Sequence, residues 1–196
     1  MDSMRFILYA GVALAVPLIG LAQPFVALST QEKLSFHARN SFGPLALVGI
    51  AAYAGILQEA DAPLEWGQGA SGYGKRFAST LAYSGIHSAM ALGLDTALHQ
   101  DPRYFRSTHT GFWRRTGHAF RGTILTRTDR GAETLSTWRL GSAYGAAYLS
   151  NQWYPRRLNT VALGFAEGSV QLGFDVLSNM GSEFWPDIKR KVFRRK

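Results

Sequence analysis

The 196-residue chain has no cysteine. Disulfides and thiolate metal sites both need that side chain, so neither can hold the fold together and stability must come from packing. No two segments of the chain concentrate His and carboxylate residues at the spacing of metal ligands either. We therefore expect no metal and no cofactor.

The N-terminus lacks an apolar run long enough for a comfortable transmembrane helix. Residues 6–21 carry no charge, but a span needs about 20 residues, and Pro17 disfavours a continuous helix. Arg5 before this run, with the small residues Gly20 and Ala22 near its end, gives the layout of a secretory signal. We predict an export signal at residues 1–22, a single domain at 23–188 and a basic tail at 189–196. An uncleaved N-terminal anchor is the alternative.

Acidic residues are scarce, with 13 Asp and Glu against 21 Lys and Arg, and the net charge is +8. Residues 103–157 hold ten Arg against only Asp129 and Glu133, and the basic tail adds six more positive charges. A basic protein in the cytoplasm would suggest nucleic acid, but an exported protein meets lipid phosphates and glycolipids instead. We expect an anionic membrane lipid or glycolipid as partner, and no nucleic acid.

Capping and helix-breaking residues divide the mature chain into segments. Ser29 and Glu32 have capping-box spacing, which predicts a helix to about Ser41. Gly43-Pro44 should interrupt it, and a second segment should run to Glu59. Residues 61–74 hold four Gly and one Pro and predict a loop, of a kind that is often functional when it carries Trp and Tyr. Further helices are predicted at 75–99, 112–125, 133–151 and 159–179, with a turn at 128–131 and a short basic helix from residue 183.

Small residues recur at every fourth position in three of these helices. The sets are Gly85, Ala89 and Gly93, then Gly141 and Gly145, then Gly164 and Gly168. Four residues make almost one helical turn, so each set lies on one face and lets another helix approach closely. We predict an all-α, glycine-rich, closely packed helical bundle that is membrane-embedded or membrane-adherent. The same small-residue faces also allow a homo-oligomer.

Three windows of the mature chain carry no formal charge: residues 40–58, 77–94 and 140–155. By hydropathy only the first comes close to a membrane span. A closely packed soluble bundle is therefore the alternative to a polytopic one.

Three residues of the predicted helix at 75–99 are candidates for catalysis: His87, Asp95 and His99. Asp95 and His99 stand four residues apart, so they should share a face and could act as an acid–base pair. The competing interpretation is a salt bridge at the helix end, with His99 near the carbonyl terminus.

Glu167 and Asp175 lie in a stretch that has no basic residue. If they are buried, they need partners, and the Arg-rich middle of the chain is the obvious donor. Structural ion pairing is favoured over catalysis by paired carboxylates.

Arginine and aromatic residues alternate in the Arg-rich middle of the chain. Guanidinium groups match phosphate geometry, and Trp is typical of membrane interfaces. The predicted lipid head-group site consists of Arg103, Arg106, Trp113, Arg114 and Arg115. A solvated basic face is the alternative.

Several short motifs occur in a fixed order over residues 31–188. They are Trp66-Gly67-Gln68-Gly69-Ala70, Asp101-Pro102-Arg103-Tyr104-Phe105, Arg127-Thr128-Asp129, Ser150-Asn151, Tyr154-Pro155 and Glu183-Phe184-Trp185-Pro186-Asp187-Ile188. Together they resemble a family of exported hypothetical proteins abundant in acidobacteria. The resemblance implies an envelope location and a single-domain fold, and it implies no activity, cofactor or catalytic residue.

We therefore expect an exported bacterial envelope protein with a structural or anionic-lipid-interacting role at the membrane. The alternative is an envelope hydrolase or transferase that acts on a lipid or glycan through His87, Asp95, His99 and the Arg cluster. A common pocket around these groups would favour the enzyme.

Overall fold

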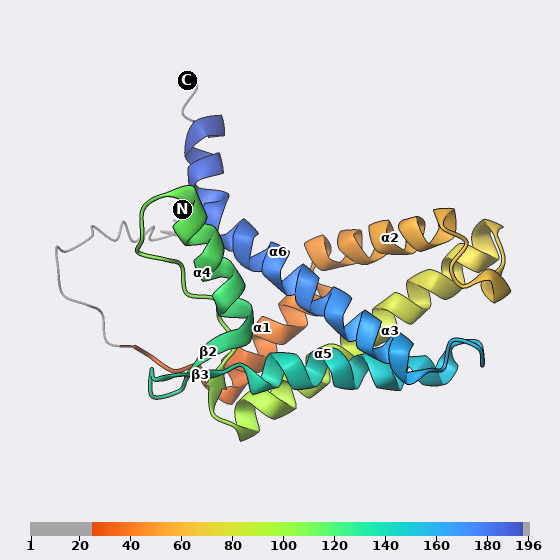
Figure 1. The fold of residues 1–196 in the computed structure, drawn as a ribbon, viewed down its shortest axis with the longest axis horizontal. Helices are drawn as coiled ribbons and strands as arrows, with labels where there is room; N and C mark the ends of the chain where they lie inside the picture. The colour runs from red at the N-terminus through yellow and green to blue at the C-terminus, as the bar shows by residue number, and fades with distance from the viewer. Residues whose placement is uncertain (1–24, 194–196) are drawn as a thin grey trace, which may run out of the picture.

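The computed structural model describes residues 25–193 as a mostly helical domain with a small three-stranded sheet at one end (Figure 1). Helices α2, α3, α5 and α6 run along the long axis in alternating directions, with α3 packed against both α2 and α5, and α5 packed against α6. The helical fold is confirmed, but the sheet was not expected. The predicted signal at 1–22 and the last three residues of the basic tail lie outside the described residues.

The first two helices follow the capping and breaking residues. In α1 (Thr30–Phe42), Ser29 and Glu32 form the predicted capping box, with the Glu32 backbone N–H donating to Ser29 Oγ at 3.3 Å. Helix α1 ends because Gly43, the residue before Pro44, takes an extended backbone conformation, and a Cβ at this position would collide with the Arg39 carbonyl oxygen. Pro44 then begins α2 (Pro44–Glu59), where its missing N–H costs nothing. Both predicted segments are confirmed.

Helix α3 (Gly69–Ala97) differs from its predicted bounds at both ends. It begins six residues before Lys75, so the loop that precedes it is shorter than expected and includes the 3-10 turn η1 (Leu64–Trp66). It ends at Ala97 rather than His99, because His99 takes a left-handed backbone conformation with φ of 51°. The chain then turns directly into strand β1 (Gln100–Asp101).

The sheet corrects the predicted helix at 133–151. Strand β2 (Leu125–Thr128) follows α4 (Phe112–Ile124) and pairs antiparallel with β1 and with β3 (Glu133–Leu135). The predicted turn at 128–131 is confirmed as the hairpin between β2 and β3, with Gly131 at φ 85°. Helix α5 (Thr137–Ser150) begins only after β3, because the hairpin pairs residues 133–135 before a helix can include them.

After α5, the 3-10 turn η2 (Asn151–Trp153) and the following Tyr154-Pro155 end the helical run as predicted. Helix α6 (Val161–Phe193) then runs without a break, where a long helix and a separate short one were expected. Gly181 does not interrupt it, and Pro186 lies inside it. Residues 189–193, predicted as part of a free basic tail, are the last turns of α6.

Glycines accept large side chains where α5 packs between α3 and α6. Gly141 and Gly145 of α5 face Leu94 and Met90 of α3. On the other side, two glycines of α6 accept tyrosine rings of α5, which are the pairs Gly164–Tyr148 and Gly168–Tyr144. A Cβ at Gly164 would lie 2.5 Å from the Tyr148 ring, well inside van der Waals contact. At these four positions the helix approach depends on the missing side chain.

We expect Gly168→Ala to destabilise the protein by about 1–3 kcal/mol, because the added Cβ would overlap the Tyr144 ring, so that the ring or α6 has to shift. Gly173→Ala is the matched control on the same helix. Nothing lies within 4 Å of its added Cβ, so the better helix propensity of alanine should leave stability unchanged or raised. Thermal unfolding of both variants checks this, and equal midpoints would contradict it.

Candidate functional site

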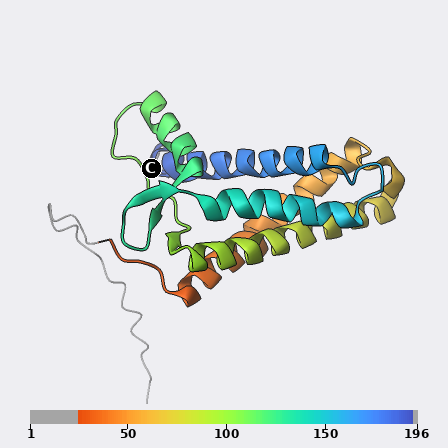
Figure 2. The same cartoon turned by 60° about the horizontal axis from the view of Figure 1, so that its bottom comes forward.

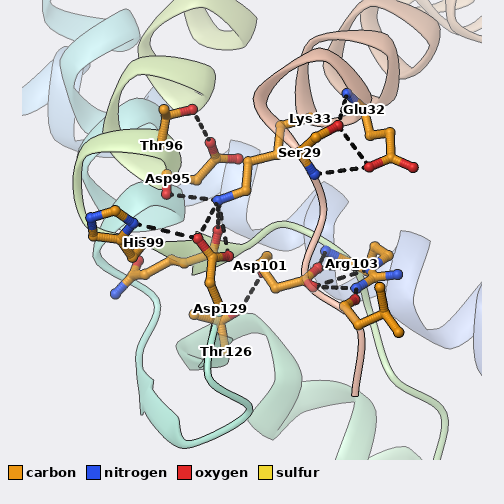
Figure 3. A network of polar contacts seen from close by, with 12 residues as sticks. Ser29, Glu32, Lys33, Asp95, Thr96, His99, Asp101, Arg103, Thr126 and Asp129 are labelled. Atoms are coloured by element: carbon orange, nitrogen blue, oxygen red, sulfur yellow. Dashed lines mark hydrogen bonds and ion pairs between the residues drawn. The ribbon is translucent and has the colours of Figure 1, made fainter. Parts of the chain in front are cut away.

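A buried network of charged groups lies at the sheet end of the bundle, where α1, the end of α3 and the β2–β3 hairpin meet (Figure 3). Its centre is Lys33 of α1, of which 2% is exposed. The Lys33 ammonium donates to the backbone carbonyls of Asp95 at 3.1 Å and Gln100 at 2.8 Å. It also contacts both carboxylate oxygens of Asp129, at 3.1 and 3.2 Å. One cation therefore joins three elements that are distant in sequence.

Asp95, at the end of α3, is fully buried and is paired with a histidine of α1. Its Oδ2 lies 2.6 Å from His37 Nε2, and its Oδ1 accepts from Thr96 Oγ1 at 3.3 Å. The His37 ring is itself packed edge-on against Trp138, with ring centroids 5.6 Å apart. Because a buried carboxylate without a partner is strongly destabilising, the His37–Asp95 contact fixes α1 against α3.

Strand β1 supplies a second buried carboxylate to this end of the molecule. Asp101 accepts from the Arg103 guanidinium through both of its oxygens, at 2.5 to 3.1 Å, and this hydrogen bonding raises the pKa of Arg103. Arg103 also donates to the Val26 carbonyl at 2.7 Å. The Asp101 carbonyl accepts from Thr126 Oγ1 at 2.6 Å. Arg103 is thus ion-paired and hydrogen-bonded within the protein.

The three candidate catalytic residues are not brought together. Asp95 is buried against His37, whereas the His99 side chain is 82% exposed and lies 3.6 Å from Asp129. The expected pair of Asp95 and His99 on one helical face is absent because α3 ends at Ala97. His87 lies further along α3, stacked on Tyr83 with Nε2 3.2 Å from Ser142 Oγ. These side chains do not surround a common cavity.

Sequence reasoning missed Lys33 and His37, the two residues that organise the network. Together with Ser41 they are the buried positions of α1, and they repeat at four-residue spacing. This polar stripe was visible in the sequence. In a helix of a water-soluble protein, a polar stripe normally faces solvent. In α1 the polar stripe is buried instead.

A second ion cluster fixes the far end of α6 against α4. Glu183 is fully buried and accepts from Arg115 Nε at 2.8 Å, from Tyr104 Oη at 2.9 Å and from the Ser107 backbone N–H at 2.9 Å. Burial by itself raises the pKa of Glu183, but these hydrogen bonds outweigh it and hold the pKa below its ordinary value. Arg115 also reaches Asp187 at 2.5 Å. Like Arg103, it is used to hold the fold.

The other three residues of the predicted head-group site remain on the surface. Arg106, Trp113 and Arg114 are exposed, with Trp113 at 81%. Among the described residues, Arg106 and Arg114 make no ion pair. On α4, Trp113 shares an exposed apolar face with Phe120 and Ile124. The predicted cluster is therefore divided between two half-buried arginines that are ion-paired within the protein and an exposed group on or near α4.

The acidic residues of α6 have different partners. Asp175 lies 3.6 Å from Arg139, which is 5% exposed, so the expected pairing with the Arg-rich middle of the chain is confirmed there. Glu167 instead accepts from Ser150 Oγ at 3.2 Å. The two carboxylates therefore serve separate contacts with α5.

Within residues 25–193, no group of three or more His, Asp or Glu side chains is arranged to hold a metal ion. No protein-family model, no curated protein and no solved structure matches the chain. Its function is therefore inferred from its own geometry.

We expect Lys33→Met to lower the free energy of unfolding by about 3 kcal/mol, because it removes the cation from a buried cluster and leaves Asp129 with only the exposed His99 beside it. The double variant Lys33→Met/Asp129→Asn should recover part of that loss, since it no longer strands a carboxylate. Lys75→Met, at an exposed lysine of α3, is the control and should change stability by less than about 0.5 kcal/mol. Chemical or thermal unfolding of the purified variants measures these differences. Equal stability of Lys33→Met and Lys75→Met would contradict a structural role for the network.

Proposed function

We propose that this chain is a membrane-embedded helical protein of the bacterial envelope that binds anionic lipid head groups through the exposed residues Arg106, Trp113 and Arg114. The observation that carries the proposal is an inverted distribution of polarity. The largest fully buried side chains of the described residues are polar or charged, with Pro102 as the exception, and Arg76, Glu183 and Asp95 are among them.

Large apolar side chains point outward instead. Ile50 and Trp138 are the only ones in the buried core of the described residues, and the rest of that core is alanine. Within the described part of the chain, twenty-five large hydrophobic side chains are exposed, among them Leu45 at 85%, Val161 at 76% and Leu177 at 63%. A water-soluble domain of this size buries its Leu, Ile, Val and Phe, and exposes its charges. A bilayer reverses that preference, because lipid tails solvate apolar side chains and charged groups must find partners inside.

The dimensions of the bundle fit this environment. Residues 77–94 of α3 carry no charge between Arg76 and Asp95, a rise of about 27 Å at 1.5 Å per residue. The hydrocarbon core of a bilayer is about 30 Å thick. Helices α1 and α2 together, Thr30–Glu59, have a window of mean hydropathy 1.5 and are long and apolar enough to cross it. With α5 and the N-terminal half of α6, they would form the membrane part of the bundle.

Tryptophan positions add independent support. Trp66 and Trp153 lie at the end of the bundle where α3 begins, beside the charged residues Lys75 and Arg157. Trp113 and Trp185 lie at the α4 end, and both are exposed. Trp is enriched at the two interfaces of a membrane, where its ring meets both lipid tails and head groups.

Helix α4 supplies the lipid-binding part of the proposal. Its exposed face carries Trp113, Phe120 and Ile124, with Arg114 beside that face. An amphipathic helix of this kind lies in the interface plane and attracts anionic lipid. The enzyme alternative has no matching observation, because His87, Asp95 and His99 do not share a cavity.

Membrane fractionation tests the embedding. We expect the protein to stay in the membrane pellet after alkaline carbonate extraction and to leave it only with detergent, because its exposed apolar side chains need lipid tails or detergent around them. A peripheral membrane protein prepared in parallel, released by carbonate, is the control. Recovery of this chain in the soluble fraction would overturn the embedding.

Lipid selectivity tests the head-group part separately. In detergent, we expect phosphatidylglycerol to raise the thermal midpoint more than phosphatidylcholine does, because guanidinium groups pair with the anionic phosphate. Arg106→Gln/Arg114→Gln should weaken phosphatidylglycerol binding about tenfold or more, since each basic residue near a membrane contributes about 1 kcal/mol. Arg156→Gln, an exposed arginine in the loop at the other end of the bundle, is the matched control. An equal loss in both variants would contradict a site at α4.

A further inference from the structure

A cavity of about 390 Å³, largely open to solvent, lies at the end of the bundle opposite the sheet, where the loop before α3 meets the loop after α5. Figures 1 and 2 both place these two loops at the same end. The cavity is lined by Trp66, Lys75, Ala78, Ser79, Ala82 and Trp153. Its size is at the lower end of the range for small-molecule sites, about 300–1,000 Å³.

The wall that carries Trp66 is held by a single buried cation. Arg76 of α3 is 0% exposed, and its guanidinium donates to the carbonyls of Ala62 at 2.9 Å, Pro63 at 2.9 Å and Gly67 at 2.6 Å. It also reaches Gln58 Oε1 at 2.6 Å. These acceptors surround Trp66 in the sequence, so Arg76 fixes the loop that presents this ring.

Glycines make that loop geometry accessible. Gly67 and Gly69 adopt φ of 69° and 74°, where a side chain would strain the backbone. Gly72 lies against the Gly67 carbonyl, and a Cβ there would also come within 2.8 Å of Arg76 Nη1. The run Trp66-Gly67-Gln68-Gly69 can therefore fold around Arg76 because glycine stands at the two positions that need a positive φ.

The part of the lining that carries Trp153 is fixed by different contacts. The Trp153 indole N–H donates to Ser79 Oγ at 2.8 Å, which sets the plane of the ring against α3. Trp66 meets Tyr154 edge-on, with centroids 5.3 Å apart. Arg157 hydrogen-bonds Glu65 and so joins the two loops next to the cavity. Both rings are therefore positioned before any ligand arrives, which reduces the entropy lost on binding.

Helix α3 contributes two small side chains and one charge to the same lining. Ala78 and Ala82 leave space because their side chains end at Cβ, and the Lys75 ammonium makes no ion pair within the described part of the chain. Two indole rings offer flat, electron-rich faces on which the C–H groups of a sugar ring stack. The Lys75 ammonium can pair with one negative charge on a ligand.

We propose that this cavity binds a saccharide ring that carries one anionic group, with the ring against Trp66 and Trp153 and the anion on Lys75. A free sugar acid and the acidic sugar head group of a glycolipid share this chemistry. The site is at the other end of the bundle from α4, and it does not depend on the lipid-binding function proposed above.

Titration with three soluble probes tests the site on the full chain, purified in a detergent without a sugar head group. Methyl glucuronide carries both features, methyl glucoside only the ring and acetate only the charge. We expect saturation-transfer NMR to detect methyl glucuronide binding, with methyl glucoside at least tenfold weaker and acetate undetectable. Lys75→Ala should lower the affinity for methyl glucuronide to the affinity for methyl glucoside. Trp153→Phe, which keeps a ring but loses the hydrogen bond to Ser79, should weaken the binding of both sugars. Trp113→Phe at the α4 end is the matched control and should change neither.

A second arm distinguishes the sources of the ligand. Nanodiscs that contain glucuronosyl diacylglycerol are compared with nanodiscs that contain glucosyl diacylglycerol. For each source, the Lys75-dependent preference is the affinity for the acidic sugar divided by the affinity for the neutral sugar. If this preference is at least tenfold stronger for the glycolipids than for the free methyl sugars, the site belongs to a membrane head group. If the two preferences are equal, it belongs to a free sugar acid. Binding of acetate as tight as that of methyl glucuronide, an absence of binding by every probe, or binding unaffected by Lys75→Ala would overturn the proposal. None of these outcomes depends on carbonate extraction or on phosphatidylglycerol selectivity, so the two proposals fail separately.

Discussion

Charges buried inside this bundle have to be neutralised by other groups of the same chain, and the tertiary structure is arranged around a few of them. Lys33 joins α1 to the end of α3 and to the β2–β3 hairpin. Arg76 gathers the loop before α3, and Glu183 ties α6 to α4 and to the segment before it. Each of these groups sits where elements meet rather than in the middle of a helix pair. Removing one partner leaves a buried charge without solvation, so breaking one of these clusters costs more than breaking a surface ion pair.

Because polar clusters lie inside and large apolar side chains lie outside, small residues are left to form the contacts between helices. Since bulky hydrophobic residues point outward, the contact surfaces between helices consist of small residues, such as Ala143, Ala146 and Ala147 on α5. Glycine faces on α5 and α6 then admit Met90 and Tyr144 from the neighbouring helix. The two ends of the bundle, free of this constraint, take different chemistries. The sheet end is basic and amphipathic, and the loop end holds two positioned tryptophans and a free lysine.

Local signals in the sequence predicted the parts of the fold that local interactions decide. The Ser29 capping box, the break at Gly43-Pro44 and the turn at 128–131 were all correct, because each depends on residues within one turn of one another. The errors have long-range causes. Residues 133–135 form a strand because β2 pairs with them, and α6 continues past residue 179 because Asn179 and Glu183 bond to α4 and its neighbouring segment. Of the candidate site, Arg139–Asp175 was foreseeable as a charge that needed a partner, whereas His37–Asp95 joins residues 58 positions apart.

The sequence by itself determined where α1 and α2 begin and end, which faces carry small residues, and that the positive charge gathers in the Arg-rich middle and the C-terminal end. It did not determine which face of each helix points inward, because periodicity separates two faces without saying which solvent surrounds them. Only the tertiary structure decided that the stripe of Lys33, His37 and Ser41 is interior and that Arg103 and Arg115 are bound while Arg106 and Arg114 are exposed. The physical reason is that a charge is buried only where several distant segments together supply its partners, and that arrangement exists only once the chain has folded.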